Sequence, residues 1–420
     1  MRHQWLGKFS GGTSPERVAD SASKAFDIPF LVVLAALTAI GVLAVYSATF
    51  DEVGKQWEKQ IAYIVVGMLA MAALYLIPPR LFYAVSYPLY AISLPPLLYI
   101  IIFKANSVER WIALPGGFNL QPSELTKVGF LLAMARMLSI RPITLSRPRT
   151  LIPPLLLFIP PFLLVLNQPN LSTAISFVAM SGVMAYWAGL RIKEIFYLAS
   201  PVISVALTFH HIAWAFMFLL LITTMVLSRL NLRAMILLIV MNIAAGYGSI
   251  YIWNKVLYEH QRSRIQIFVN PQLDPLGAGY QVLQSKVAIG SGRLTGKGYL
   301  HGSQTNLSFL PEEHTDFIFS VIGEQFGYLG CLLVLILFFI LLWRTVRIAQ
   351  DMKDPFISLV AIGVSGILAF HILVNISMTI GMMPVTGLPL PFMSYGGSFL
   401  ISCFFMLGII VNFRAHGRNI

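Results

Sequence analysis

The chain has 420 residues, of which 57% are hydrophobic and only 11% are charged, and its formal net charge is +12. Soluble domains are nearer ~45–50% apolar and ~25% charged, so an aqueous core cannot hide this excess and a lipid bilayer must solvate it. The basic excess does not indicate nucleic-acid binding, because the Lys and Arg residues separate apolar runs and form no arginine-rich segment.

The apolar runs predict an all-α, polytopic integral membrane helical bundle with about twelve transmembrane helices. A membrane-spanning helix needs ~20 consecutive apolar residues. In chain order, the predicted helices are 29–50, 60–77, 81–103, 123–140, 150–166, 171–189, 195–209, 212–228, 234–254, 317–343, 355–380 and 398–413. The first run has no small-residue cleavage site after it, so we interpret it as a membrane span and not as a signal peptide.

The positions of the basic residues orient these helices, because Lys and Arg collect in the short cytoplasmic loops of membrane proteins. With the N-terminus inside, eighteen Lys and Arg residues fall in cytoplasmic segments and four in short outer loops. The sequence therefore predicts cytoplasmic tails at 1–28 and 414–420. It also predicts a large extracytoplasmic loop at 255–316.

Asp316 is the first candidate for chemistry, because it lies where this loop enters the helix 317–343. An ionised carboxylate next to hydrocarbon is costly, so such groups usually face a cavity and have a function. Partial desolvation makes a carboxylate a stronger base, which suits general-base catalysis. The alternative is an acid that caps a helix and favours its dipole.

Further charged candidates surround the predicted outer face. Glu124 and Lys127 are three residues apart and therefore share one helix face, either as a structural ion pair or as a charged wall that binds an anion. Glu324 follows Asp316 by two helical turns, where it either binds substrate or contacts another helix. His314 could orient Asp316, or it could simply bond within the loop.

Several cations could bind a phosphate group on the outer side. They are Arg110, Lys286, Arg293 and Lys297. A glycine-rich run at 290–298 would let backbone N–H groups approach that phosphate, although its spacing is not that of a P-loop. The sequence contains no metal-ligand spacing and no nucleotide-binding motif, so we expect no cofactor and no resident metal. A divalent cation could still assist the reaction, and the energy must come from a gradient or from an activated substrate already in the membrane.

Several segments resemble the SEDS family (shape, elongation, division and sporulation). The segments that carry the resemblance are Arg110–Trp111, Gln121–Lys127, Leu283–Gly292, Gly296–Gly302, Phe309–Phe319 and Leu388–Ser398. The similarity runs in order through most of residues 29–413, and the stretch 297–304 is more like the elongation members of the family than the division members.

The resemblance implies a peptidoglycan glycosyltransferase of the bacterial inner (plasma) membrane. Such an enzyme polymerises lipid II, a disaccharide-pentapeptide on undecaprenyl diphosphate, at the outer leaflet during cell elongation and rod-shape maintenance. Family members work with a class B penicillin-binding protein and other proteins of the elongation complex. The family's essential aspartate corresponds to Asp316, and its Glu and Lys correspond to Glu124 and Lys127.

The chain departs from the family pattern at two places. Asn170 stands where the family commonly has an aspartate, so hydrogen bonding is kept and the charge is lost. Family members usually have ten spans, so residues 195–233 are expected to be an inserted helical pair. Two additional crossings preserve the orientation of every later helix.

The resulting hypothesis assigns Asp316 as the single base of an inverting displacement. Preorganised cations at Lys127, Arg110 or Lys286 would balance the charge of the diphosphate as it leaves. One alternative is a transporter that moves lipid II across the bilayer, which predicts charged residues along the whole path. The other is a structural hub for the cell-wall machinery.

Overall fold

The computed structural model describes residues 27–50, 56–103, 110–114, 118–140, 148–168, 170–208, 210–251, 278–306 and 312–417, together with isolated positions between 253 and 267. Nearly all of the predicted N-terminal tail lies outside the described residues, as do 418–420 of the predicted C-terminal tail. Most of the first part of the predicted outer loop, up to residue 277, lies outside them as well.

The twelve long helices of the described part of the chain coincide with the twelve predicted spans. They are α2 (Ile28–Ala48), α3 (Gln56–Tyr75), α4 (Pro79–Phe103), α5 (Pro122–Ile140), α6 (Ile152–Leu166), α7 (Leu171–Trp187), α8 (Ile192–Leu207), α9 (His211–Leu227), α10 (Leu232–Tyr251), α14 (Ile318–Asp351), α15 (Pro355–Thr379) and α16 (Gly397–His416). The largest difference from prediction is in α14, which continues eight residues beyond 343.

The protein is an all-α, polytopic membrane protein. Eight of the described helices are long and apolar enough to cross a membrane, and α7 and α9 are shorter apolar helices of 17 residues. The remaining two, α5 and α8, carry charged residues near their first turns. Large apolar side chains point outward along these helices, among them Leu69, Ile92 and Phe339, each more than 60% exposed. A bilayer accommodates such a surface because every helical backbone group is bonded within its own helix.

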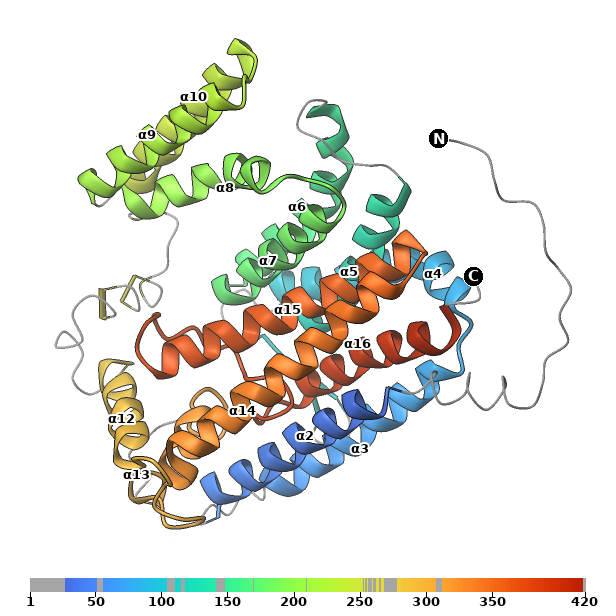
Figure 1. Cartoon of the computed structure of the whole chain (residues 1–420), viewed down its shortest axis with the longest axis vertical. Coiled ribbons are helices and arrows are strands. Elements are labelled where there is room, and N and C mark those ends of the chain that lie inside the picture. Colours follow the sequence, from blue (N-terminus) through green and yellow to red (C-terminus); the bar gives the residue numbers. More distant parts are fainter. Residues whose placement is uncertain are drawn as a thin grey trace, which may run out of the picture.

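The centre of the bundle is formed by α5 and α15, which have buried residues on nearly all of their faces. Figure 1 shows α14, α15 and α16 side by side, with α2 and α3 lying against them. The helix α16 packs along α3, α4 packs along α5, and α7 packs along α15. This arrangement brings the N-termini of α5, α14 and α16 and the C-terminus of α15 to the same end of the bundle.

The helices α8, α9 and α10 form a separate unit, which Figure 1 shows apart from the main bundle. Their core contains Tyr197, Met217, Leu221, Met225 and Leu238. Polar side chains also join them: Asn242 Nδ2 donates to Ser200 Oγ at 2.8 Å, and Ser204 Oγ donates to the Asn242 carbonyl at 3.0 Å. That residues 195–233 are an insertion stays a prediction, but α8 and α9 do depend mainly on each other and on α10 for packing.

Short elements cover the end of the bundle where α5, α14 and α16 begin, and one more follows the other end of α5. The strands β1 (Ile112–Leu114) and β2 (Phe118–Leu120) form an antiparallel hairpin directly before α5, which the sequence did not predict because each strand has only three residues. The described part of the outer loop contains α12 (Ala278–Ser291) and α13 (Ser303–Asn306), while the 3-10 helix η1 (Pro148–Leu151) leads into α6. Ser285 Oγ of α12 donates to the Thr379 carbonyl at 2.7 Å, which fastens α12 to the end of α15.

The helix α14 is broken at Gly327, whose φ of +65° and ψ of −160° are not helical. Only glycine adopts this conformation without strain, and a Cβ here would also overlap the backbone of Leu294 and Gly296. The glycine-rich run lies across this break, where the Tyr328 N–H donates to the Arg293 carbonyl at 2.9 Å. The break therefore lets α14 hold part of the outer loop through backbone hydrogen bonds.

Candidate active site

Asp316 lies in the turn that precedes α14, and its side chain is partly exposed. Its backbone N–H donates to the Glu312 carbonyl at 3.0 Å, and its carbonyl accepts from Asn375 Nδ2 of α15 at 2.9 Å. The Oδ2 atom of Asp316 lies close to Gly387, where an added Cβ would be only 3.5 Å away. The carboxylate is therefore held at the end of the bundle where α14 begins, next to α15 and the segment that follows it.

Glu124 and Lys127 form an ion pair in the first turns of α5, with 2.7 Å between Oε1 and Nζ. Both side chains are buried, and Lys127 is 0% exposed. Ser402 Oγ of α16 donates to Glu124 Oε2 at 3.2 Å. The sequence left open a structural ion pair or a charged wall that binds an anion. The structure encloses the ammonium completely, so in this conformation Lys127 does not reach a substrate directly.

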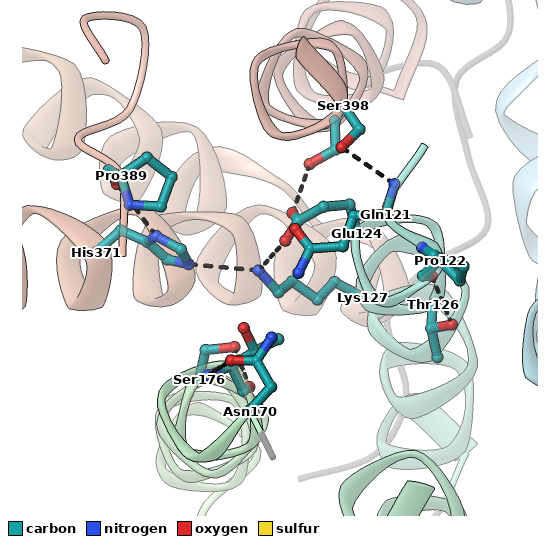
Figure 2. Close-up of polar contacts among 12 residues, drawn as sticks. Gln121, Pro122, Glu124, Thr126, Lys127, Asn170, Ser176, His371, Pro389 and Ser398 are labelled. Atoms are coloured by element: carbon teal, nitrogen blue, oxygen red, sulfur yellow. Dashed lines mark hydrogen bonds and ion pairs between the residues drawn. The ribbon is translucent and has the colours of Figure 1, made fainter. Parts of the chain in front are cut away.

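His371 of α15 completes the surroundings of this pair (Figure 2). Its Nε2 atom lies 3.4 Å from Lys127 Nζ, and its Nδ1 atom lies 3.3 Å from the Pro389 carbonyl oxygen. The imidazole stacks on the Phe399 ring with centroids 4.6 Å apart, and Lys127 Nζ lies 5.6 Å from the same ring. The ammonium is thus surrounded by a carboxylate, an imidazole and an aromatic face.

The outer carboxylate and the buried ion pair are connected through α15. Asn375 donates to the Leu388 carbonyl at 2.8 Å as well as to the Asp316 carbonyl. His371, one helical turn earlier, contacts the next carbonyl along, that of Pro389. Sequence reasoning did not single out His371 and Asn375. The signal was present, because two polar side chains four residues apart in an apolar span share one face and are costly in a membrane.

A cavity of about 450 Å³ lies next to the turn that carries Asp316. Its lining residues are Tyr63, Trp111, Ala113, Asn119, Thr315, Tyr395, Gly396 and Gly397. Thr315 is the direct neighbour of Asp316, and the lining combines three aromatic rings with amide and hydroxyl groups. Burial raises the pKa of Tyr395, so its phenol stays protonated at neutral pH and remains a hydrogen-bond donor.

A second, apolar pocket of about 230 Å³ lies between α3, α4, α5 and α16. It shares Tyr63 and Asn119 with the first cavity, so the two pockets adjoin. Leu89, Leu125 and Ile401 are typical of its lining, and Glu124 is its one charged lining residue among those described. Such a combination of an apolar pocket with a polar mouth fits an amphipathic ligand.

Three more predicted site residues are His314, Arg110 and Lys286, and each has its own surroundings. The His314 carbonyl accepts from the Tyr395 N–H at 2.9 Å, and its ring lies 5.7 Å from the Tyr395 ring, so His314 supports the wall of the larger cavity. Arg110 is half-buried, two residues before β1. Lys286 is exposed on α12 and lies against Gly381. Each of these three stays a predicted substrate contact.

Glu324 is buried, and the contacts of its carboxylate are all with the outer loop. It accepts from Lys297 Nζ at 2.7 Å, from the Gln304 N–H at 2.9 Å and from Thr305 Oγ1 at 2.9 Å. These contacts favour loop positioning over direct substrate binding. The glycine-rich run likewise does not present its N–H groups to a phosphate at 296–298, because those groups donate to the carbonyls of Gly292, Glu324 and Gln325.

Asn170 is the N-cap of α7. Its side-chain oxygen accepts from the Thr173 N–H at 3.3 Å. Asn and Asp are equally good N-caps, so the helix keeps its cap where the family's charge is lost. Among the described residues, no group of three His, Cys, Asp or Glu side chains is placed to hold a metal ion.

The chain belongs to the FtsW/RodA/SpoVE family, described as Cell cycle protein, which is the SEDS family. The family model matches residues 28–218 and 213–419. The chain is 36% identical to the peptidoglycan glycosyltransferase MrdB of Escherichia coli K12 over 394 residues, covering 93% of this chain and 94% of that one. It is 31% identical to the peptidoglycan glycosyltransferase RodA of Treponema pallidum, covering 93% and 98%.

Solved structures share the fold. One was reported in work on the structural coordination of polymerization and crosslinking by a peptidoglycan synthase complex. It matches with a TM-score of 0.68 and 28% identity, over 93% of this chain and 98% of that chain. The rod shape determining protein RodA of Thermus thermophilus matches with a TM-score of 0.60 and 24% identity, over 93% and 97%.

Proposed function

We propose that this chain is a peptidoglycan glycosyltransferase that polymerises lipid II during cell elongation. The observation that carries the proposal is a 450 Å³ cavity lined by aromatic and polar groups, among them Thr315 next to Asp316, which adjoins an apolar pocket. Lipid II has sugars and a diphosphate on a long polyprenyl chain, so its two halves need this kind of paired site. The similarity to the MrdB and RodA glycosyltransferases supports the same activity.

The larger cavity suits the sugars of the substrate. The faces of Trp111 and Tyr395 offer flat apolar surfaces for the C–H groups of a pyranose ring, and Asn119 offers an amide for its hydroxyl groups. The smaller pocket suits the first isoprene units of the lipid, because Leu89, Leu125 and Ile401 line it. Binding the two halves separately would fix the reacting sugar beside Asp316 and supply proximity.

The reaction itself needs one base. The 4-hydroxyl oxygen of the acceptor sugar attacks C1 of the donor sugar and forms the new glycosidic bond, while the bond from C1 to the diphosphate oxygen breaks. The hydroxyl proton passes to the Asp316 carboxylate, and the diphosphate leaves with the bonding electron pair. Because attack occurs opposite the leaving group, the configuration at C1 inverts, so a single carboxylate is sufficient.

The diphosphate leaves readily if cations balance its charge. Lys286 and Arg110 are at the outer end of the bundle and are proposed for this task, while the enclosed Lys127 would act through Glu124 and its neighbours. A divalent cation could also balance the charge of the diphosphate. Comparing the polymerisation rate with and without a chelator tests whether the reaction needs such a cation.

We also propose that both termini are cytoplasmic in the bacterial inner membrane and that the cavity opens on the outer leaflet. The partner is proposed to be a class B penicillin-binding protein, alongside other proteins of the elongation complex. The distribution of Lys and Arg supports the orientation. The structural similarity to a chain of a peptidoglycan synthase complex that coordinates polymerization and crosslinking supports a partner that cross-links the glycan.

The purified chain in detergent should polymerise lipid II, with and without its partner. Asp316→Asn and Asp316→Ala should lower the rate by about 10²-fold or more, as expected for loss of a general base. Glu312→Gln is the matched control, because Glu312 is an exposed carboxylate in the same turn and the Gln amide oxygen can still accept from Thr315 Oγ1. Wild-type rates in both Asp316 variants would contradict the assignment. Detergent abolishes compartments, so polymerisation there also separates this activity from transport.

A further inference from the structure

His371 is a buried histidine whose two ring nitrogens face polar groups from different parts of the chain. It lies in α15, is 1% exposed, and contacts groups from two other parts of the chain. One ring nitrogen faces the Lys127 ammonium of α5, and the other faces the Pro389 carbonyl in the segment between α15 and α16. Figure 2 shows the imidazole between these two groups.

The partners of His371 determine which nitrogen carries the proton. A carbonyl oxygen only accepts, so Nδ1 must be protonated to bond Pro389. An ammonium only donates, so Nε2 must present its lone pair to Lys127. The imidazole is therefore neutral, in the Nδ1–H tautomer. An imidazolium would place two positive charges 3.4 Å apart in a buried site.

The Pro389 carbonyl belongs to the segment that forms the site. Two residues before it, Gly387 lies against the Asp316 carboxylate, and six residues after it, Tyr395 lines the larger cavity. Asn375 bonds the preceding carbonyl, that of Leu388, from the same face of α15. The His371 and Asn375 side chains therefore hold consecutive carbonyls of one segment against one helix.

We propose that His371 is a positioning residue that holds the buried Glu124–Lys127 pair in a defined place relative to the segment 387–395 beside Asp316. The imidazole bridges the two through contacts of 3.3 and 3.4 Å, slightly longer than the usual hydrogen-bond range, as is common in active sites without substrate. This inference rests on the proposed function, since the effect of the bridge is on the transfer of the glycan. His371 itself does not touch the substrate cavities.

The test uses the full chain purified in detergent and compares His371→Met with His371→Gln. These side chains have the same length, so the pair differs mainly in hydrogen bonding. The Gln amide supplies one donor for Pro389 and one acceptor for Lys127, as the imidazole does. The alternative is that His371 acts only through its ring stack on Phe399. His371→Phe tests this, because it keeps the stack and loses both hydrogen bonds.

The bridge predicts that His371→Met and His371→Phe lower kcat by about tenfold or more, the usual effect of losing a hydrogen bond to a buried charge. KM for lipid II should stay within about twofold, because the contact is not with substrate. His371→Gln should recover most of the lost kcat. Leu373→Ala is the control, since Leu373 is 66% exposed on the same helix and should leave kinetics unchanged.

A second measurement does not depend on activity. Hydrogen exchange of the backbone amides in 386–397 should rise in the Met and Phe variants and stay near wild type in the Gln variant. Full kcat in His371→Met, or equal loss in the Met and Gln variants with unchanged exchange, would overturn the inference. A wild-type chain that does not polymerise lipid II would instead reject the proposed function, and the exchange measurement would still decide whether the bridge positions the segment.

Discussion

Two carboxylate–lysine pairs near the predicted outer face have the same separation and quite different surroundings. In both Glu124–Lys127 and Glu324–Lys297 the oxygen and nitrogen atoms are 2.7 Å apart. The first pair is enclosed by side chains of α5, α15 and α16, and its lysine side chain is 1% exposed. In the second pair the lysine side chain is 28% exposed and the carboxylate accepts backbone N–H groups of the outer loop.

The contrast between the pairs shows that residue type and distance do not determine what an ion pair does. Backbone N–H groups satisfy Glu324, so this carboxylate stabilises a loop in the way that a capping residue stabilises a helix end. Among the described residues, the Glu124 carboxylate is bonded by the side chains of Lys127 and Ser402, and it also lines the apolar pocket. Burying such a pair usually gains little stability over apolar packing, which favours a functional reason for its presence.

The largest effect is expected for Lys127→Met. It leaves the Glu124 carboxylate buried without its counter-ion, and removing one partner of a buried pair costs about 3–5 kcal/mol. The unfolding midpoint of the purified protein in detergent should fall markedly, and polymerisation should be lost. The double variant Glu124→Gln with Lys127→Met should regain much of the stability without regaining activity. Equal stability of the single and double variants would show that the charges are not coupled.

An intermediate effect is expected for Glu324→Gln. The neutral amide weakens the bonds from Lys297 and Thr305, at about 1.5–3 kcal/mol for hydrogen bonds to a charged group. The loss of stability should be confined to the outer loop. Hydrogen exchange of the backbone amides should therefore increase in 297–306, while the amides of α5 remain protected. Because the residue is predicted to act through the loop, we expect partial activity. Loss as complete as that of Asp316→Asn would instead place Glu324 in the reaction.

The smallest effect is expected for Lys297→Met, because the side chain is partly solvated and Glu324 keeps its backbone donors. A partly exposed ion pair contributes about 1 kcal/mol or less and weakens with salt. The difference in unfolding midpoint between wild type and variant should shrink as the salt concentration rises. A large, salt-independent loss would mean that this pair behaves like Glu124–Lys127.

Much of the fold was predictable because the signals for it are local. The twelve helices follow from apolar runs, and the family follows from short motifs such as 309–319 and 388–398. The hairpin 112–120 and the break at Gly327 were not predictable in this way. Each depends on contacts between segments, since Gly327 takes its conformation where the glycine-rich run crosses α14.

The candidate site was predictable only in part. Asp316, Glu124 and Lys127 were identified by charge at a membrane boundary, and whether they act as predicted is for the variants to decide. The environment of each was not visible in the sequence. Nothing in residues 296–298 indicated that their N–H groups donate to protein carbonyls, and nothing near Lys127 indicated that His371, 244 residues away, lies beside it.

Hydropathy, charge bias and short motifs are properties of contiguous residues, so reading the chain was enough to identify a membrane bundle of the SEDS family. The folded chain was needed to show that Lys127 is enclosed, that Glu324 serves the loop, and that α15 joins the buried ion pair to the segment beside Asp316. The physical reason is that burial and hydrogen-bond partnership depend on which distant segments meet. In this protein the charged groups near Asp316 acquire their separate environments only from contacts between distant segments.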